Sequence, residues 1–234
     1  MNRFFAFIFL IVTSYGQVFA QSADDTLVPP QVITLKDGIY LSFKDLQTNN
    51  PLPKENIFVD GDKSQSDFIS KVLTDNKEIV FSYKGTKYKA EVAKTWGYCQ
   101  NGILYINYKG QFARVTLFGS ISHFMATIMV TRYVSNFNNG YYGWGGYYGG
   151  MGGMYSPSTP VRQPETHEFL LDFQTGNIDE CTPTYLETLL SRDIKLYAEY
   201  MDLKRKKRNE LMILYIRRYN ENHPIVFLQS DGAK

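Results

Sequence analysis

The sequence is poor in the residues from which catalytic and metal sites are usually built. It holds two cysteines and three histidines among 234 residues, and its formal net charge is only +2. A nucleic-acid-binding protein normally carries a basic excess on one face, so this balance argues against nucleic acid as a partner. After residues 1–20 no apolar run is long enough to cross a bilayer, and no transmembrane helix is predicted there.

Motifs of enzymes and cofactor sites are missing as well. There is no G-x-S-x-G elbow, and the glycines at 140–153 lack the strand-to-helix pattern of a phosphate loop. His123, His167 and His223 are scattered along the chain, and none has a partner at ligand spacing, so no metal site and no cofactor is predicted. No catalytic residue is assigned. The carboxylates that remain for a glycosidase-type pair are Asp172, Asp179 and Glu180.

Residues 1–20 have the pattern of a secretory signal peptide. Arg3 gives the positive start, residues 4–12 form a short apolar region, and Val18-Phe19-Ala20 is a small-residue cleavage site. No cysteine follows the expected cut, so no lipid anchor is predicted there. We therefore expect an exported protein, located in the periplasm, at the cell surface or in the medium.

Cys99 and Cys181 would both remain in that oxidising compartment. They could form one disulfide if their Cα atoms come within reach. Alternatively, Cys99 is a small apolar residue on the buried face of a sheet. A catalytic dyad of Cys99 with His123 is not expected, because the register described next places them on opposite faces.

Residues 78–131 are predicted to form antiparallel strands joined by tight turns. Asn101-Gly102 is the strongest signal, because both central positions of a type I′ turn need φ > 0, and Lys84-Gly85 and Lys109-Gly110 fit similar loops. The turns pair apolar residues with apolar residues. The predicted pairs are Phe81 with Tyr88, Tyr98 with Tyr105, Ile106 with Ala113 and, after a turn at Gly119-Ser120, Val115 with Phe124.

This register divides the sheet into two faces. The predicted core face carries Cys99, Leu104, Ile106, Ala113, Val115, Leu117, Phe124, Ala126, Ile128 and Val130. The other face is aromatic and polar, with Tyr98, Tyr105, Asn107, Phe112, Arg114, Thr116, His123, Met125 and Thr131. An aromatic face of this kind suits a binding surface.

The chain divides into a signal peptide (1–20), short strands and a helix (21–77), an antiparallel sheet (78–178) and a helical segment of the same domain (179–234). The fold class is α+β: a twisted meander of six to eight strands, which could close in part into a barrel, packed by two or three C-terminal helices. Local signals include a capping box at Ser42 and Asp45, a helix start at Thr182-Pro183, a helix end at His223-Pro224, and possible short strands at 32–35, 39–41 and 225–228.

Residues 137–164 form a segment rich in glycine and tyrosine, predicted to be a long mobile hairpin tip or linker. It is either a tolerated insert or an aromatic arm that binds sugars, aromatic groups or a membrane interface. The candidate ligand-binding residues in such an arm are Tyr141, Tyr142, Trp144, Tyr147 and Tyr148.

Two charged segments allow alternatives. The basic run at 204–208, with Arg217 and Arg218, could bind an anionic envelope component, although such a run is more often a solvated helix face or helix junction. Asp60-Gly61-Asp62 resembles part of a calcium loop but lacks the later glutamate, so a surface turn is predicted.

Three groups of residues carry a family resemblance. They are residues 38–46 with Asn49-Asn50-Pro51, then Trp96-Gly97-Tyr98-Cys99 with Gly102 and Tyr105-Ile106-Asn107, and finally Arg218-Tyr219-Asn220 with His223-Pro224. In this order the chain resembles a family of uncharacterised secreted proteins, a domain of unknown function, from Bacteroidetes-type bacteria. The resemblance implies export and supplies no catalytic or ligand residues.

These observations favour an exported cell-envelope protein that acts as a non-enzymatic binding or interaction module. Its partner would be an envelope glycan, lipid or protein. One alternative is a hydrolase acting on an envelope polymer, and another is a structural protein that self-associates through the Gly/Tyr-rich arm.

Overall fold

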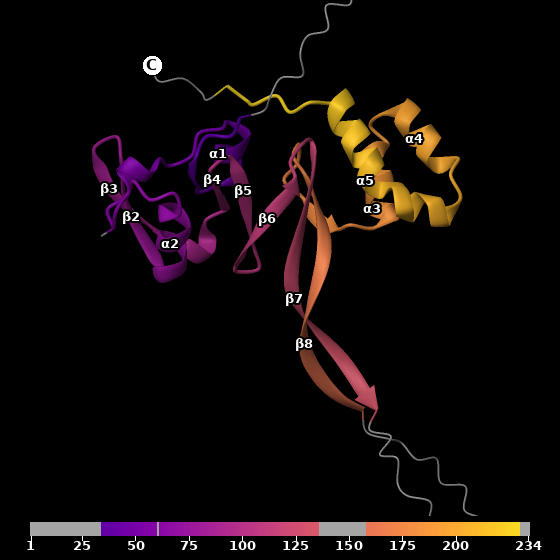
Figure 1. Cartoon of the computed structure of the whole chain (residues 1–234), viewed down its shortest axis with the longest axis horizontal. Helices are drawn as coiled ribbons and strands as arrows, with labels where there is room; N and C mark the ends of the chain where they lie inside the picture. Colours follow the sequence, from indigo (N-terminus) through magenta and orange to yellow (C-terminus); the bar gives the residue numbers. More distant parts are fainter. Residues whose placement is uncertain (1–33, 60, 136–157, 230–234) are drawn as a thin grey trace, which may run out of the picture. The chain divides into compact units, whose positions relative to one another are not determined.

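The structure is a computed structural model that describes residues 34–59, 61–135 and 158–229. The expected signal peptide (1–20) lies outside the described residues, and so do the candidate residues Tyr141, Tyr142, Trp144, Tyr147 and Tyr148. The described chain forms a seven-stranded antiparallel sheet, a two-stranded sheet and three C-terminal helices (Figure 1). The predicted α+β class is confirmed.

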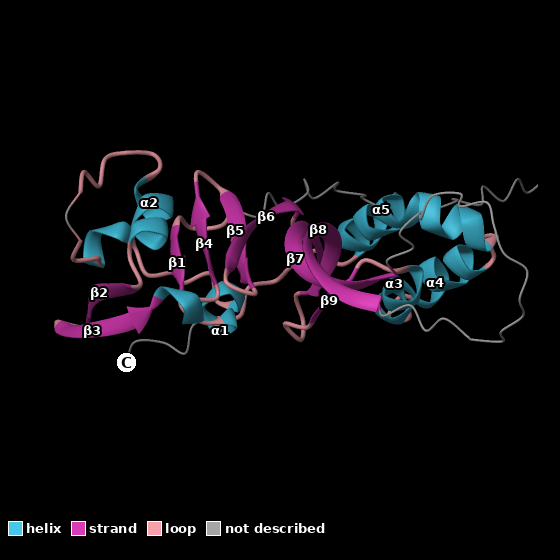
Figure 2. Cartoon of the chain, turned by 90° about the horizontal axis from the view of Figure 1, so that it is seen from below, coloured by secondary structure: helices cyan, strands magenta, loops and turns pink. Residues whose placement is uncertain are grey.

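The seven-stranded sheet is a meander with one added edge strand, and it curls into a half-barrel (Figure 2). Its order is β1-β4-β5-β6-β7-β8-β9, so six strands that follow one another in the chain are neighbours in space. The strands are β1 (Gly38–Tyr40), β4 (Gly97–Gln100), β5 (Ile103–Tyr108), β6 (Gln111–Leu117), β7 (Ile121–Ser135), β8 (Ser158–Asp172) and β9 (Ile178–Glu180).

The tight turns adopt the backbone that their residues predict. Lys84, Asn101 and Lys109 have φ values of 50°, 54° and 52°, and the glycine after each has φ between 72° and 83°. Two successive positive φ values define type I′ turns, which set the register of the flanking strands. All four predicted pairs are present: Phe81 with Tyr88, Tyr98 with Tyr105, Ile106 with Ala113, and Val115 with Phe124.

The first hairpin departs from the predicted meander. Strands β2 (Glu78–Tyr83) and β3 (Thr86–Glu91) form a sheet of their own, and β4 pairs with β1 instead. A 3₁₀ turn, η2 (Val92–Lys94), separates β3 from β4. The side-chain amide of Asn107 holds this turn by donating to the carbonyls of Val92, Ala93 and Thr95 at 3.3, 3.2 and 2.9 Å.

Seven of the ten residues of the predicted core face are buried, and Leu117, Ile128 and Val130 are half-buried. Cys99, Leu104, Ile106, Ala113, Val115, Phe124 and Ala126 all belong to one buried cluster, which Phe169, Leu171 and Phe173 join. Leu117 packs instead with the C-terminal helices. The pairing of β6 with β7 shifts between Val115 and Leu117, and an extra residue of this kind moves the following side chain to the other face.

The aromatic part of the opposite face is covered too, which corrects the expectation of an aromatic binding surface there, while Arg114, Thr116, Met125 and Thr131 on the same face are exposed. Tyr98 is buried, and its ring stacks on that of Tyr105 at 4.6 Å. Both rings pack in a second cluster with residues of β2 and of helix α2 (Phe68–Asp75). The Tyr98 side chain is therefore held inside the fold, and burial raises its pKa to about 12.

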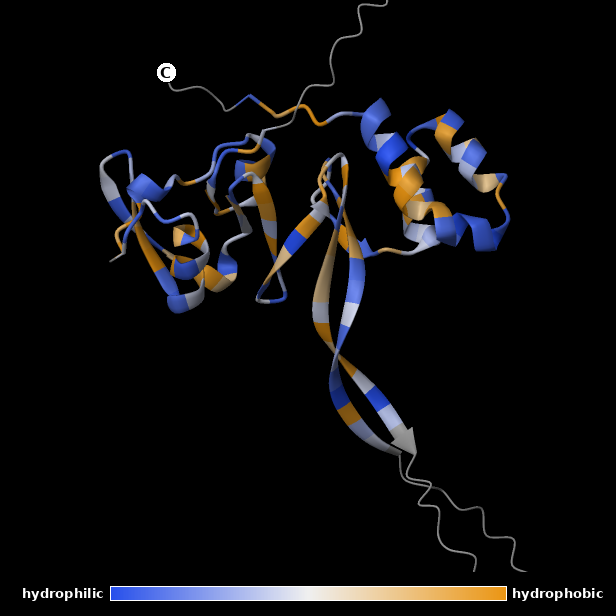
Figure 3. Ribbon diagram, in the orientation of Figure 1, coloured by the Kyte–Doolittle hydropathy of each residue, from blue (hydrophilic) through white to orange (hydrophobic). Residues whose placement is uncertain are grey.

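The C-terminal helices α3 (Pro183–Leu190), α4 (Ile194–Met201) and α5 (Arg205–Asn222) form a third cluster with Ile121 and Leu170 of the sheet, and their apolar residues gather where α3 and α5 meet (Figure 3). Thr182 caps α3, as predicted, and α5 ends before His223. The described part of the chain contains no helix with the length and hydropathy needed to cross a membrane.

The predicted capping box is confirmed, whereas two of the predicted short strands are not formed. Ser42 and Asp45 form both bonds of the box at the start of α1 (Phe43–Gln47), and η1 (Lys54–Asn56) follows. Residues 34–35 and 225–228 are not strands. Among the described residues, the segment 225–228 forms one backbone hydrogen bond, from Leu228 N to Gln47 O at 2.8 Å, which is too little to define a strand.

Strands β7 and β8 are longer than the sequence predicts. They pair without interruption from Ile121 with Asp172 to Ser135 with Ser158. Residues 158–164 are therefore strand and not part of the predicted loop 137–164. Pro160 and Pro164 are tolerated because β9 pairs with β8 only at 169–171, so the prolines lie where the outer edge of β8 has no ladder partner among the described residues.

Candidate functional site

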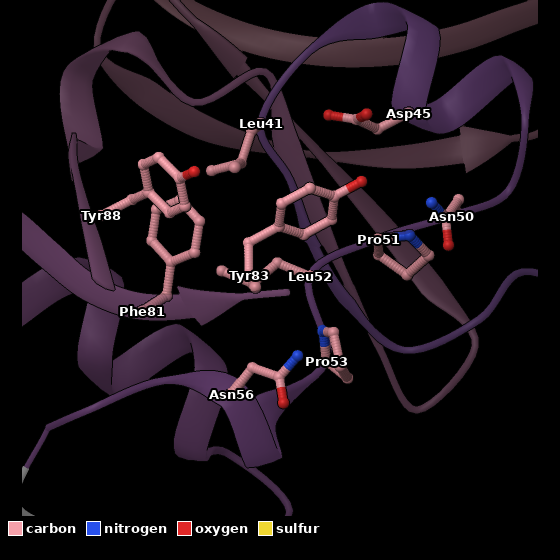
Figure 4. A pocket seen from close by; sticks show the side chains of 10 residues that line it. All are labelled: Leu41, Asp45, Asn50, Pro51, Leu52, Pro53, Asn56, Phe81, Tyr83 and Tyr88. Atoms are coloured by element: carbon pink, nitrogen blue, oxygen red, sulfur yellow. The ribbon is translucent and has the colours of Figure 1, made fainter. Parts of the chain in front are cut away.

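A surface hollow of about 520 Å³ opens between the β2–β3 hairpin and the segment that follows β1 (Figure 4). Small-molecule sites have volumes of about 300–1,000 Å³, so the hollow is large enough to hold one. In Figure 4 the ring of Tyr83 lies in the middle of the hollow, with Tyr88 over Phe81 on one side of it. The lining residues are Leu41, Asp45, Asn50, Pro51, Leu52, Pro53, Asn56, Phe81, Tyr83 and Tyr88.

One wall is the apolar face of the hairpin. Phe81 and Tyr88 are direct cross-strand partners, and their rings stack at 5.9 Å. Tyr83 meets the edge of Tyr88 at 6.5 Å. Along β2 the side chains of this face rise from the core to the solvent: Ile79 is fully buried, Phe81 is 7 % exposed and Tyr83 is 52 % exposed. Tyr88 is 47 % exposed, so both tyrosines offer ring surface to a ligand.

The opposite wall is held against β1 by a close backbone contact. Ile39 and Leu52 exchange two backbone hydrogen bonds, of 2.9 and 2.8 Å. Gly38 has φ +150°, and a Cβ there would lie 2.6 Å from the carbonyl oxygen of Leu52. Glycine is thus required at this position, and it lets Asn50-Pro51-Leu52-Pro53 approach the sheet.

The polar groups of the hollow are only partly used by the fold. One oxygen of Asp45 accepts the backbone N–H of Ser42 at 2.8 Å, and among the described residues the other oxygen accepts no hydrogen bond. Within the described ranges, the side-chain amides of Asn50 and Asn56 have no hydrogen-bond partner in the protein. These groups can therefore donate to or accept from a ligand that lies on the tyrosine rings.

The carboxylates considered for hydrolysis have structural partners instead. Asp172 is buried, and Arg192 binds it through two bonds of 2.9 and 2.7 Å. Thr175 Oγ1 and the backbone N–H of Gln174 donate to the same carboxylate at 2.7 and 3.1 Å. Burial alone would raise the pKa of Asp172, but these donors lower it below the ordinary aspartate value. A carboxylate so fully engaged is a poor acid or base.

The other two candidates are surface groups. Asp179 accepts the backbone N–H of Glu180 at 2.7 Å, and Glu180 contacts His167 Nδ1 at 3.1 Å. Neither lines the tyrosine hollow. The three carboxylates therefore do not form the site that a glycosidase would need within that hollow.

Both cysteines are free, so of the two alternatives the disulfide is not formed. Cys99 is buried on the core face, as the alternative states. Its thiol donates to Asp37 Oδ1 at 3.4 Å, and burial together with this bond raises the pKa of Cys99 to about 12. Asp37 also accepts the N–H groups of Asn101 and Gly102 at 3.0 Å, so Cys99 is a structural residue behind a turn.

The histidines are scattered in the sequence but not isolated in space. His167 contacts Glu180 at 3.1 Å, and His223 contacts Asp193 at 3.0 Å. His123 lies on the face opposite Cys99, as predicted, with Glu168 and Cys181 beside it. The sequence alone misses this last group because each member lies on a different strand or strand end.

The charged segments follow the simpler interpretation. The basic run at 204–208 spans the junction between α4 and α5, where Arg208 pairs with Glu187, and Lys207 with Glu210 at 2.7 Å. Asp62 accepts the N–H and hydroxyl of Ser64 at 2.9 and 2.6 Å, as in a surface turn. Asp60 lies outside the described residues.

Together these features define a small α+β protein with a curled antiparallel sheet and a tyrosine-lined surface hollow. A model of the Family of unknown function (DUF6563) matches residues 38–223, and the chain belongs to this family. The matched range contains both walls of the hollow. No curated protein and no solved structure matches the chain.

Several residues that carry the family resemblance have a structural role, in which they hold a turn or allow two strands to approach closely. Asn220 clamps the turn before β7, accepting from Ile121 N at 2.8 Å and donating to Ile121 O at 2.9 Å. At Gly97 a Cβ would lie 2.3 Å from the backbone oxygen of Tyr105. Leu41, Asp45, Asn50 and Pro51 differ, because they line the hollow.

Sequence reasoning missed the residues of the hollow: Asp45, Asn50, Asn56, Tyr83 and Tyr88. A signal was present, since the Lys84-Gly85 turn pairs Tyr83 with Thr86 and thereby places Tyr83 and Tyr88 on one face near the turn of the hairpin. The sequence places the β2–β3 hairpin in the main sheet, where the face that carries Tyr83 and Tyr88 would be buried. Its separation from the sheet is what exposes the two rings.

Proposed function

We propose that the protein is an exported, non-enzymatic binding module of the bacterial cell envelope, and that its hollow binds a glycan. The observation that carries the proposal is the pair of exposed tyrosine rings beside polar groups that the fold leaves open. The signal-peptide pattern of residues 1–20 supports export, and export brings the hollow into contact with envelope polymers.

A sugar matches both parts of the hollow. Each sugar ring has an apolar face of C–H groups, which stacks on a tyrosine ring, and a rim of hydroxyls, which need hydrogen-bond partners. Tyr83 and Tyr88 supply the rings, and Asp45, Asn50 and Asn56 supply acceptors and donors around them. An acyl chain would leave those polar groups without partners, which is unfavourable.

Binding is favoured over hydrolysis by the number of acids in the hollow. Glycoside hydrolysis in most families uses two carboxyl groups on either side of the scissile bond. Among the residues that line the hollow, Asp45 is the one acid, and one of its oxygens already caps α1. The hollow can therefore hold a glycan in place without the pair of groups that would cleave it.

The test measures binding of the purified full chain to soluble fragments of peptidoglycan, lipopolysaccharide core and capsular polysaccharide by calorimetry. We expect saturable binding to one of these classes. Replacing Tyr83 or Tyr88 with alanine should weaken it about 3- to 10-fold each, because a ring contact contributes about 0.5–1.5 kcal/mol. Both side chains are about half exposed, so the variants should remain folded.

Tyr133→Ala is the matched control, since Tyr133 is 72 % exposed on β7 and lies outside the hollow. It should bind as the original chain does. Unchanged affinity in a Tyr83→Ala/Tyr88→Ala double variant would contradict the proposal. If deletion of residues 138–155 abolished binding while that double variant retained it, the site would lie in the Gly/Tyr-rich segment and not in the hollow.

A further inference from the structure

Away from the hollow, the register of the sheet sets three ligand-type side chains on one face. Met125 pairs with Glu168 and His123 with Leu170 across β7 and β8. The backbone N–H of Cys181, just after β9, donates to Glu168 O at 2.8 Å, which continues the β8–β9 ladder. Paired residues share a face. The ligand atoms of His123, Glu168 and Cys181 all lie within 4.8 Å of one another.

Thr116, on β6, determines which nitrogen of His123 faces this group. The Thr116 hydroxyl lies 2.7 Å from Nδ1 and donates to the backbone oxygen of His123 at 3.1 Å. A hydroxyl has a single proton, so both contacts are satisfied when Nδ1 carries a proton and donates to Thr116. Neutral His123 then directs the lone pair of Nε2 towards Glu168 and Cys181, and this is the form that binds metals.

That nitrogen is buried and has no hydrogen-bond partner in the described chain. The His123 side chain is only 9 % exposed, and the nearest oxygen of Glu168 lies 3.4 Å from Nε2 without the geometry of a hydrogen bond. In this tautomer two acceptors face one another, an arrangement that costs free energy unless a cation lies between them. A buried nitrogen without a hydrogen-bond partner is unfavourable, and a bound metal ion would give His123 Nε2 the partner that it lacks.

We propose that His123, Glu168 and Cys181 form a zinc-binding site. Imidazole nitrogen, carboxylate oxygen and thiolate sulfur are the three donor types that bind Zn²⁺ in proteins. Three protein ligands leave the fourth tetrahedral position for a water molecule or for a group on a partner. The Glu168 side chain is 51 % exposed, so an ion can enter from the solvent on that side.

The distances fit such a site with little movement. Ligand atoms around a tetrahedral zinc ion lie about 3.3–3.8 Å from one another, given bonds of about 2.0–2.3 Å. The separation of 3.4 Å between His123 Nε2 and Glu168 already has this value. With all three atoms within 4.8 Å, Cys181 Sγ needs to approach by no more than about 1.5 Å, which a side-chain rotation provides.

The Cys181 thiol should lose its proton when the metal ion binds. Burial, and then the negative charge of Glu168, raises the pKa of Cys181 to about 11, so the side chain is protonated near neutral pH. A coordinated Zn²⁺ reverses this preference and displaces the proton. Zinc binding should therefore release a proton and shield the sulfur from alkylating reagents.

The test uses the purified full chain, kept reduced and stripped of metal with a chelator. Zn²⁺ is titrated in competition with a chromophoric chelator, and Co²⁺ is titrated while the absorption spectrum is recorded. We expect one equivalent to bind and the Co²⁺ form to show the near-ultraviolet charge-transfer band of a thiolate bond. Cys181→Ser should abolish the band and weaken zinc affinity more than about 100-fold, and Thr116→Val should weaken it about 10- to 100-fold without removing the band.

Two controls separate this site from other groups of the same kind. Cys99→Ala removes the other thiol, which lies on the opposite face, and His167→Gln removes a histidine that contacts Glu165 and Glu180. Both variants should keep the band and the affinity. Glu168→Gln changes an exposed side chain and should stay folded, and in this variant Zn²⁺ should no longer slow the alkylation of Cys181.

The proposal is overturned if the original chain fails to compete with the chelator for Zn²⁺. Equal zinc affinity in the Cys181→Ser variant would overturn it as well, and so would a thiolate band that disappears in Cys99→Ala and persists in Cys181→Ser. Alkylation of Cys181 that is equally fast with and without Zn²⁺ would lead to the same conclusion.

Discussion

The two groups of elements that pack on the second face of the sheet both contain ion pairs, such as Glu78 with Lys89 in the hairpin, but they differ in how many polar side chains the fold leaves without a partner. Among the C-terminal helices, acids and bases neutralise one another: Glu187 pairs with Arg208, and Glu199 with Arg218. Around the β2–β3 hairpin, the amides of Asn50 and Asn56 stay open beside two exposed tyrosines. A polar side chain that already has a partner within the fold offers few hydrogen bonds to a ligand. The side chains without such a partner therefore mark the candidate site.

His123 is an exception within the satisfied region. Its Nε2 and the Nε of Arg208 are the buried side-chain atoms that lack a hydrogen-bond partner in the described ranges. Arg208 has other nitrogens and uses one of them to bind Glu187. His123 has no such substitute, because its second nitrogen is already bonded to Thr116. This is why the histidine, and not the arginine, supports the inference of a bound ion.

Removing core volume under the C-terminal helices should have the largest effect on stability. Leu190 on α3 is fully buried, so Leu190→Ala should lower the free energy of unfolding by about 2–5 kcal/mol, through lost burial and a cavity. Because both regions pack on one sheet, urea denaturation followed by circular dichroism and by fluorescence should still give one transition. Ile194→Ala, at a side chain that is 83 % exposed, should change stability by less than about 0.5 kcal/mol. Two separate transitions in the Leu190 variant would show that the regions are independent units.

A smaller effect is expected where an ion pair is removed. Asp172→Asn leaves Arg192 with a neutral partner and should cost about 1–3 kcal/mol, since Arg192 still reaches solvent. Folding lowers the pKa of Asp172, so the pair stabilises fully above the unfolded value of about 3.9 and its contribution is lost as the pH falls below that value. Urea titrations between neutral pH and pH 3 should therefore show a weaker acid dependence in Asp172→Asn than in the exposed control Asp179→Asn. Equal acid dependence would count against the pair.

The smallest effect should be a gain. Lys204 occupies the N-cap of α5 without a capping hydrogen bond, and a basic run follows it at the positive end of the helix dipole. Lys204→Asp supplies an acceptor for the free N–H groups and should raise the free energy of unfolding by about 0.5–1 kcal/mol. Lys204→Ala is the control and should give little change in thermal denaturation. A loss of stability in the Asp variant would show that the basic run has contacts beyond the junction.

The parts of the fold that depend on neighbouring residues could be predicted from the sequence. Asn101-Gly102 and the two Lys-Gly turns set the pairs of their hairpins, and all of these pairs are present. The separation of the first hairpin could not be predicted, because it depends on Asn107 reaching back to Val92 and Thr95. Such contacts leave no local pattern in the chain.

The candidate sites show the same limit. Tyr83 and Tyr88 were correctly placed on one face, but the hollow also needs the contact of Leu52 with Ile39, which closes the far wall. The group around His123 needs the register of β7 with β8, and the two strands are separated by the long segment that obscured their pairing. A site made by strands distant in sequence can be seen only once their register is known.

The last rung of the β7–β8 ribbon has a practical consequence. Ser135 and Ser158 are direct partners in the ladder, so the chain that joins them leaves and re-enters the fold at adjacent points. Fifteen paired residues span about 50 Å at about 3.4 Å per residue, which carries these two points far along the ribbon from its first rung at Ile121. Epitopes, labels or foreign loops can therefore be inserted between these two serines while the β7–β8 register, on which the His123 group depends, is left intact.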